Sequence, residues 1–203
     1  MLSFKALAIF LLALLFTACT SPNPSSEKDD IRAKQAYSAA ATKSPTFSPL
    51  VGDTFSWYEN GIIWSVPEGE PDANMLISHM MGQVKELLVK RGYRFTTDAS
   101  NATYVLGLAV LDNQVESSKR VSQFFQVAPG INAAEQDRTA TVIAAVAKNN
   151  AWVLESGNQA IRNNLLWRSS VEAFVIEGLE PEERLQRIDR LIQVLMGSFP
   201  SGK

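Results

Sequence analysis

The chain has 203 residues, 46% hydrophobic and 20% charged, and its formal net charge at pH 7 is −2. This length suits one domain with a sizeable core, and the slightly acidic balance gives no electrostatic basis for binding nucleic acid. The single cysteine excludes an intramolecular disulfide.

The N-terminus has the pattern of an export signal. Lys5 precedes an unbroken apolar run, residues 6–16, which is too short to span a bilayer and matches the length of a signal-peptide core. A core helix with an incidental cysteine is the alternative, but such a helix would show a polar face, and this run is apolar all round. The sequence therefore predicts a cleaved signal peptide over residues 1–18.

The residues that end this run, Phe16-Thr17-Ala18-Cys19, resemble the lipobox of bacterial lipoproteins. The resemblance implies that Cys19 becomes the acylated N-terminus of the mature protein and holds it to a membrane through its acyl chains. Stable anchoring takes two or more such chains. Thr20 stands where an Asp would resemble an inner-membrane retention signal. We therefore expect the outer membrane, with the protein facing the periplasm or displayed on the cell surface.

Residues 19–46 are predicted to be the lipidated Cys19 and a flexible tether. Pro, Ser and mixed charges dominate this stretch, so it offers little apolar surface to offset the entropy cost of ordering. Residues 29–41 could form a short helix, but they lack an apolar stripe. A single folded domain is expected over residues 47–200, followed by a tail, 201–203.

The first half of this domain begins with residues 54–64, where aromatic and β-branched residues predict a strand, or a hairpin that turns at Glu59-Asn60-Gly61. A helix is predicted within residues 71–93 and ends at Gly92. Residues 93–98 are predicted to form a short strand, and residues 102–115, apolar on both faces, are predicted to form a central strand. The apolar stripe of the helix comprises Leu76, Met80, Val84, Leu87 and Leu88.

In the second half, residues 138–148 favour a strand, although their alanines leave a helix open. Residues 165–176 alternate as a strand, and Pro181 begins a final helix that stops at Gly197. We expect an α+β fold, an antiparallel or mixed sheet of four to six strands with two helices packed on one face. In strand 165–176, Leu165, Trp167, Val171, Ala173 and Val175 are predicted to face inward, and Arg168, Ser170 and Glu172 outward.

Residues for chemistry are scarce. His79 is the single histidine and no thiol can join it, so it is interpreted as a surface residue and no metal is predicted. Phosphate-binding glycine loops and a nucleophile elbow are absent from the sequence. No catalytic residue and no cofactor are predicted, and the protein is expected not to be an enzyme.

Phe124 and Phe125 are the candidate partner-contact residues. They lie between two strongly patterned strands in residues 113–138, flanked by polar residues. If that segment is extended, neighbouring rings point to opposite sides and one faces away from the core. The alternative is an extra strand or short helix that caps the core with both rings.

Four short motifs occur from the middle of the chain to its end: Arg91-Gly92-Tyr93, Ala102-Thr103, Leu165-Leu166-Trp167-Arg168-Ser169 and Phe199-Pro200. Together these motifs resemble the domain of unknown function 4136 family of bacterial envelope lipoproteins. The resemblance covers most of residues 47–200. Thr103 and Ser169 depart from the acid and the glycine of the family pattern. The family supplies no activity to transfer.

Two functional hypotheses follow. The first is a non-enzymatic lipoprotein, anchored in the outer membrane, that binds an unidentified envelope protein or has an envelope-maintenance role. The second is a lipid or small-molecule carrier, or a cryptic hydrolase, with a pocket between sheet and helices. Polar groups that converge in an apolar pocket would favour the second, and a flat apolar patch would favour the first.

Overall fold

The structure is a computed structural model that describes residues 36–65, 73–113, 131, 137–149 and 165–202. Side chains are described throughout these ranges except at residues 59–65, where the backbone alone is described. Cys19, Phe124 and Phe125 lie outside the described residues, and so do the predicted signal peptide and most of the predicted tether.

The described residues contain a six-stranded mixed sheet in the order β1-β6-β5-β4-β2-β3. The four strands β1, β6, β5 and β4 pair antiparallel, whereas β4, β2 and β3 pair parallel. Helix α3 makes the crossover that parallel strands need between β2 and β4. The strands are β1 (Tyr37–Lys43), β2 (Thr54–Ser65), β3 (Arg94–Phe95), β4 (Tyr104–Asp112), β5 (Thr139–Lys148) and β6 (Leu165–Phe174).

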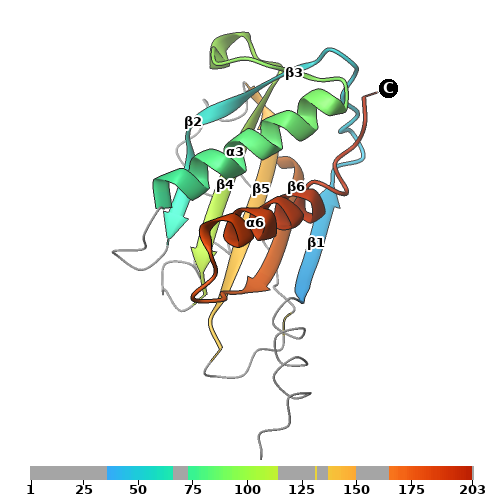
Figure 1. Ribbon diagram of the computed structural model, residues 1–203. Coiled ribbons are helices and arrows are strands. Elements are labelled where there is room, and N and C mark those ends of the chain that lie inside the picture. The colour runs from blue at the N-terminus through green and yellow to red at the C-terminus, as the bar shows by residue number, and fades with distance from the viewer. Residues whose placement is uncertain (1–35, 66–72, 114–130, 132–136, 150–164, 203) are drawn as a thin grey trace, which may run out of the picture. The chain divides into compact units, whose positions relative to one another are not determined.

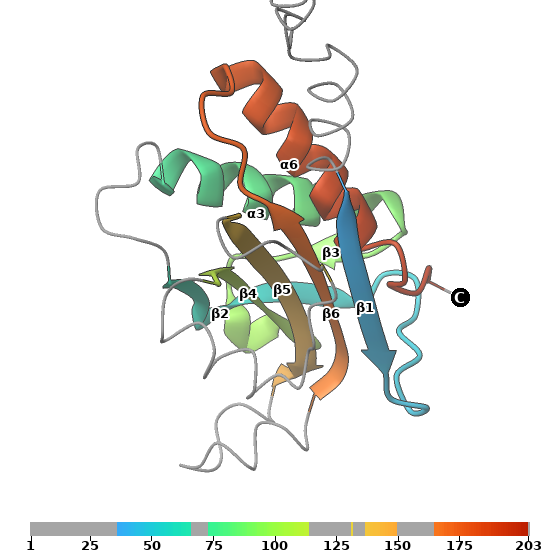
Figure 2. The same ribbon diagram turned by 90° about the horizontal axis from the view of Figure 1, so that it is seen from below.

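Helices α3 (Ala73–Lys90) and α6 (Pro181–Leu195) lie side by side on the same face of the sheet (Figures 1 and 2). The α+β fold predicted from the sequence is thereby confirmed. Neither helix, nor any other helix among the described residues, is long and apolar enough to cross a membrane.

The main core lies between the two helices and this face of the sheet. The predicted stripe of α3 turns inward and buries Leu76, Met80, Val84 and Leu88. Gly92, with a φ of 91°, ends that helix in the left-handed conformation that glycine tolerates. The stripe of α6 buries Ile188, Ile192 and Leu195 against the same face.

Strands β4 and β5 form the middle of the sheet. Every residue of β4 is buried, as its two-sided apolar pattern predicted. Residues 139–148 are a strand rather than a helix. Their alanines are placed on both faces of the sheet, where small side chains allow close packing.

The predicted tether extends too far, because residues 37–43 form edge strand β1. This strand pairs antiparallel with β6 from Tyr37, opposite Ala173, to Lys43, opposite Trp167. Its side chains are almost all exposed. An edge strand is held by main-chain hydrogen bonds along one side and needs no apolar stripe, which is why composition alone failed to reveal it.

For residues 54–64 the predicted strand is confirmed, and the alternative of a hairpin at residues 59–61 is wrong. Both halves of β2 run parallel to β4, and the register shifts between Trp57, opposite Leu106, and Ile62, opposite Leu108. The extra residues form an irregularity within one strand, so the turn residues Asn60 and Gly61 mark a bulge rather than a reversal.

The predicted facing of β6 needs a correction at its start. Trp167 is opposite Val146, but Leu165 is opposite Ala147, so Leu166 is an extra residue. Trp167 therefore faces the helices and is 1% exposed, as predicted, whereas Leu165 packs on the opposite face. An inserted residue reverses the facing of those before it.

An aromatic cluster closes one end of the main core around Phe199. The ring of Phe199 makes edge contacts with Phe47, Phe55, Tyr93 and Trp167, at centroid distances of 5.7, 5.8, 5.9 and 4.8 Å. The Tyr93 hydroxyl donates a hydrogen bond of 2.9 Å to the carbonyl of Pro200. Two motifs that lie far apart in the sequence, Arg91-Gly92-Tyr93 and Phe199-Pro200, thus meet in space.

Removing β1 should destabilise the domain. We expect a chain that begins at Lys34 to melt like one that begins at Thr20, and a chain that begins at Thr46 to melt at least roughly 4 °C lower. In a domain of this size, ~1 kcal/mol corresponds to about 2–4 °C, and loss of β1 also leaves β6 as an unpaired edge. Equal melting temperatures for all three chains would show that β1 adds nothing to stability.

Tyr93 should make the domain sensitive to alkali. Burial is the main cause that raises the pKa of Tyr93 to about 12. The unfolded chain, whose tyrosines titrate near pH 10, loses this proton first, so the free energy of unfolding should fall between pH ~10 and ~12. Burial also raises the pKa of Tyr104. A variant without the Tyr93 hydroxyl should therefore still lose some free energy of unfolding as the pH rises, but less than the wild type.

The test compares urea denaturation from pH 8 to 11.5 for the wild type and Tyr93→Phe. The variant should lose about 1 kcal/mol at pH 8 through its missing hydrogen bond and show a shallower alkaline decline. Tyr37→Phe, at a position that is 51% exposed, is the control and should follow the wild type. An unchanged decline in Tyr93→Phe would contradict this role.

Candidate functional site

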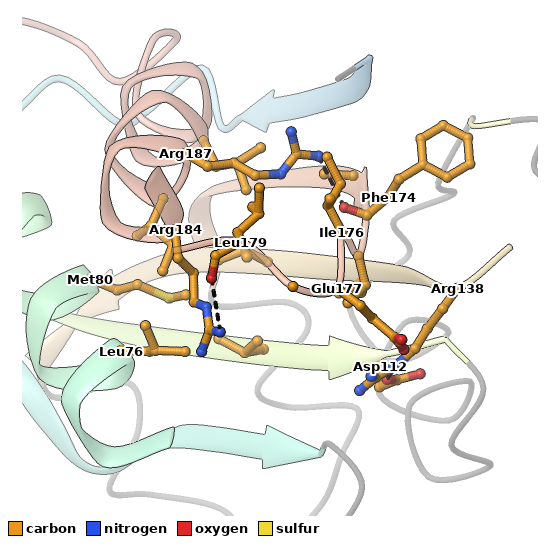
Figure 3. A pocket seen from close by; sticks show the side chains of 18 residues that line it. Leu76, Met80, Asp112, Arg138, Phe174, Ile176, Glu177, Leu179, Arg184 and Arg187 are labelled. Carbon is orange, nitrogen blue, oxygen red and sulfur yellow. Dashed lines mark hydrogen bonds and ion pairs between the residues drawn. The ribbon is translucent and has the colours of Figure 1, made fainter. Parts of the chain in front are cut away.

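A pocket of about 370 Å³ opens between the two helices and the sheet, at the end of the core opposite Phe199. Its walls come from α3, α6, the ends of β4 and β5, and the connection from β6 to α6 (Figure 3). This volume lies within the usual range for small-molecule sites, ~300–1,000 Å³.

Most of the pocket wall is apolar. Leu76 and Met80 project from α3, Val142 from β5, and Ile188 and Leu191 from α6. These residues belong to the same stripes and strand faces that build the main core. The pocket is therefore a place where the core layer is left open, and its apolar lining follows directly from the amphipathic pattern of the helices.

An ion pair between a buried carboxylate and a partly exposed arginine marks one end of the pocket. Asp112, whose side chain is 1% exposed, accepts a charge-assisted hydrogen bond from Nε of Arg138. The two residues come together because Asp112 ends β4 and Arg138 immediately precedes β5, its antiparallel neighbour. The carboxylate of Glu177 reaches toward the same end (Figure 3).

Arg184 and Arg187 line the pocket from α6. They are three residues apart, so their side chains leave the same face of the helix. Nη2 of Arg187 donates a hydrogen bond of 3.0 Å to the carbonyl of Phe174, and Nη2 of Arg184 lies 3.5 Å from the carbonyl of Leu179. Burial, and secondarily the charge of Arg190, lowers the pKa of Arg187.

A second polar cluster lies on the opposite face of the sheet, around Glu172. Glu172 was predicted to face outward. Its side chain does lie on the face of the sheet opposite the helices, but it is only 5% exposed. Its Oε1 accepts hydrogen bonds from Asn113 Nδ2 at 2.7 Å and Thr139 Oγ1 at 2.9 Å. Its Oε2 accepts one from the Ile131 backbone N–H at 3.1 Å. Three donors that converge on one carboxylate make Glu172 a structural anchor for Asn113 and Ile131.

His79 links the two helices. Its Nε2 lies 2.6 Å from Oδ1 of Asp189 on α6, and both side chains are partly exposed. The position agrees with the surface interpretation, while the contact with Asp189 was not foreseen. Among the described residues, no group of three or more His, Cys, Asp or Glu side chains could hold a metal ion.

The polar residues of the pocket had only a weak sequence signal. Asp112 follows eight apolar or small residues of a buried strand, which is an unusual place for a carboxylate. Arg184 and Arg187 resemble the ordinary polar face of an amphipathic helix. The partnership of Asp112 with Arg138 depends on strand pairing, which spacing along the chain does not reveal.

No protein-family model matches the chain, and no curated protein is similar to it in sequence. Among solved structures, it is similar to the PelC dodecamer from Paraburkholderia phytofirmans. The identity is 12% and the TM-score 0.46, with 83% of this chain and 99% of that chain covered.

It is also similar to a member of the domain of unknown function 4136 family from Bacteroides thetaiotaomicron. Here the identity is 12% and the TM-score 0.48, with 80% of this chain and 95% of that chain covered. The family that the sequence motifs resemble is therefore represented among the similar solved structures.

Replacing the buried carboxylate of Glu172 should be costly. In Glu172→Gln, the amide NH₂ must face at least one of the groups that now donate a hydrogen bond to the carboxylate, so that hydrogen bond is lost. We expect a loss of about 1–3 kcal/mol in the free energy of unfolding, measured by urea denaturation. Glu182→Gln on the exposed first turn of α6 is the control, with an expected loss below about 1 kcal/mol. Equal losses in both variants would contradict the anchoring role of Glu172.

Proposed function

We propose that this protein is a lipid-anchored, non-enzymatic lipoprotein of the bacterial envelope that binds a small, largely apolar molecule. The proposal combines an anchor at Cys19 with the pocket between the helices and the sheet. The pocket is the observation that carries the binding role, because charged side chains from the end of β4, from the residue before β5 and from α6 converge there within an apolar wall.

The composition of the pocket favours binding over catalysis. Its described lining holds aliphatic residues, one phenylalanine, arginines and two acids, with no Ser, Thr, Cys, Lys or His. Such a lining offers no side-chain nucleophile for acyl or glycosyl transfer other than a carboxylate. The carboxylate of Asp112 is engaged by Arg138. We therefore propose a carrier or sensor rather than a hydrolase.

The anchor sets the location. Acyl chains on Cys19 would hold the protein to the outer membrane, facing the periplasm. This location suits a carrier of apolar molecules, which move between membranes only with a protein to shield them from water. A contact of Phe124 and Phe125 with an envelope protein stays a prediction, and it is compatible with a carrier that delivers its ligand to a partner.

Anchoring is tested with Cys19→Ser in cells labelled with palmitate. The wild type should sediment with the outer membrane and carry the label, because two or more acyl chains are needed for stable attachment. The variant should be unlabelled and absent from the outer-membrane fraction. A variant that stays labelled and membrane-bound would exclude Cys19 as the anchor.

Ligand binding is tested with N-phenyl-naphthylamine, a neutral dye that fluoresces in apolar surroundings, on the mature chain with Cys19→Ser. Ala140 lines the pocket from β5 and is partly exposed, so Ala140→Leu should fill space with little strain on the core. We expect the dye to bind and Ala140→Leu to weaken it at least roughly tenfold. Ala41→Leu on exposed β1 is the control. Equal dye binding by all three proteins would contradict the pocket as the site.

A further inference from the structure

We propose that two copies of this protein pair through the outer edge of β1, antiparallel and about a two-fold axis at Ala40, so that their sheets become one. This contact goes beyond the proposed function and does not involve the pocket. Three observations carry it: an edge strand without the usual protection, main-chain groups that point away from the sheet, and a strand sequence that complements itself.

The two edges of the sheet differ in their protection. Edge strands of soluble proteins are normally short, bulged, charged or interrupted by proline, because an open edge pairs with other chains. At one edge, β3 has two residues, and β2 beside it is irregular between Trp57 and Ile62. At the other edge, β1 pairs with β6 over seven residues without a register shift, and it contains no proline and one charge, Lys43. Figures 1 and 2 show β1 as the outermost strand on its side of the sheet.

Every second residue of β1 presents its main-chain groups away from β6. The N–H of Ser44, the residue after β1, donates a hydrogen bond of 2.8 Å to the carbonyl of Leu166. The carbonyl of Ala40 accepts one of 3.3 Å from Oγ of Ser169 on β6. Because main-chain groups alternate in direction along a strand, the odd-numbered residues point outward, and in the described part of the chain no strand lies on that side. The outward residues are Tyr37, Ala39, Ala41 and Lys43.

The sequence of β1 suits pairing with a second copy of itself. A two-fold axis at Ala40 places an aromatic residue opposite a lysine, and a serine opposite a threonine, both of which are favourable cross-strand pairs. The single charge, Lys43, then meets no like charge. This register also pairs odd-numbered residues with odd-numbered ones, as their outward N–H and C=O groups require. The pairs are Tyr37 with Lys43, Ser38 with Thr42, and Ala39 with Ala41.

The helices leave room for the second copy. Helix α6 contacts β6 and both neighbours of that strand, β5 and β1, so it lies above β6. Two-fold pairing of antiparallel strands keeps both α6 helices on one face, and their β6 strands are then three strand spacings apart, about 14 Å. Packed helices need only about 8–10 Å between their axes, so the two helices do not collide.

The contact should be weak in solution. Most side chains of β1 are small, so pairing buries less surface than the roughly 1,200–2,000 Å² of a stable complex. We expect a dissociation constant of about 10–100 µM. The proposed anchor at Cys19 would hold two copies on one membrane surface, where a weak contact of this kind is populated.

The test measures the sedimentation of the mature Cys19→Ser chain from ~5 to ~500 µM, over which the average mass should rise from monomer toward dimer. Ala39→Pro removes an outward N–H and leaves the bonds to β6 in place. This variant should stay monomeric and keep its melting temperature at low concentration within about 2 °C. Ala40→Pro removes a donor to β6 instead, so it should lower the melting temperature.

A charge at residue 40 tests the position of the axis. In the proposed register, residue 40 of one copy lies opposite residue 40 of the other. Ala40→Lys and Ala40→Glu should therefore each weaken the dimer at least roughly tenfold, and an equal mixture of the two should dimerise again because opposite charges then meet. Val89→Lys, at a position of α3 that is 52% exposed, adds the same charge away from β1 and should leave the dimer unchanged.

Each failure has its own meaning. A chain that stays monomeric at the highest concentration would overturn the proposal. A dimer that survives Ala39→Pro would show that the copies meet elsewhere than at β1. If mixing the Ala40→Lys and Ala40→Glu variants does not restore the dimer, the two-fold register at Ala40 is wrong. None of these measurements involves a ligand, so their failure leaves the proposed function untouched.

Discussion

The insertion of Phe199 among four other aromatic rings is the contact on which the rest of the domain depends. Phe199 follows α6, and its partners come from the connection between β1 and β2, from β2, from the residues that follow α3 and from β6. Edge-to-face contacts of this kind add stability beyond area burial. They hold the chain after the C-terminal end of α6 against the sheet, and the pocket lies at the opposite end of the core.

The far ends of β4 and β5 connect the pocket with the second face of the sheet. Asp112 points to the pocket, and its neighbour Asn113 binds Glu172 on the opposite face. In the same way, Arg138 contacts Asp112 on the pocket side, and its neighbour Thr139 contacts Glu172 on the opposite face. Because successive residues of a strand point to opposite faces, two adjacent strand ends supply both an ion pair for the pocket and an anchor for Ile131.

Prediction from sequence succeeded where one face of an element decides its burial. The apolar stripe of α3, the two-sided burial of β4 and the inward facing of Trp167 all follow from apolar periodicity. Prediction from sequence failed where the pairing of strands, rather than the pattern of side chains, decides the structure. Main-chain bonds to β6 hold β1, and Leu166 shifts the facing of Leu165. Glu172 looked like a solvent-facing residue because period-two alternation tells which face a side chain takes, not whether that face is covered.

By itself, the sequence determined the fold class, the extent of both helices, the central strand and a candidate anchor at Cys19. These depend on local periodicity and on short motifs, which need no knowledge of distant partners. Only the tertiary structure decided that Asp112 meets Arg138, that Arg184 and Arg187 face an apolar cavity, and that Tyr93 binds Pro200. A binding site is a meeting of side chains from separate elements, and strand order and helix placement set which of them meet.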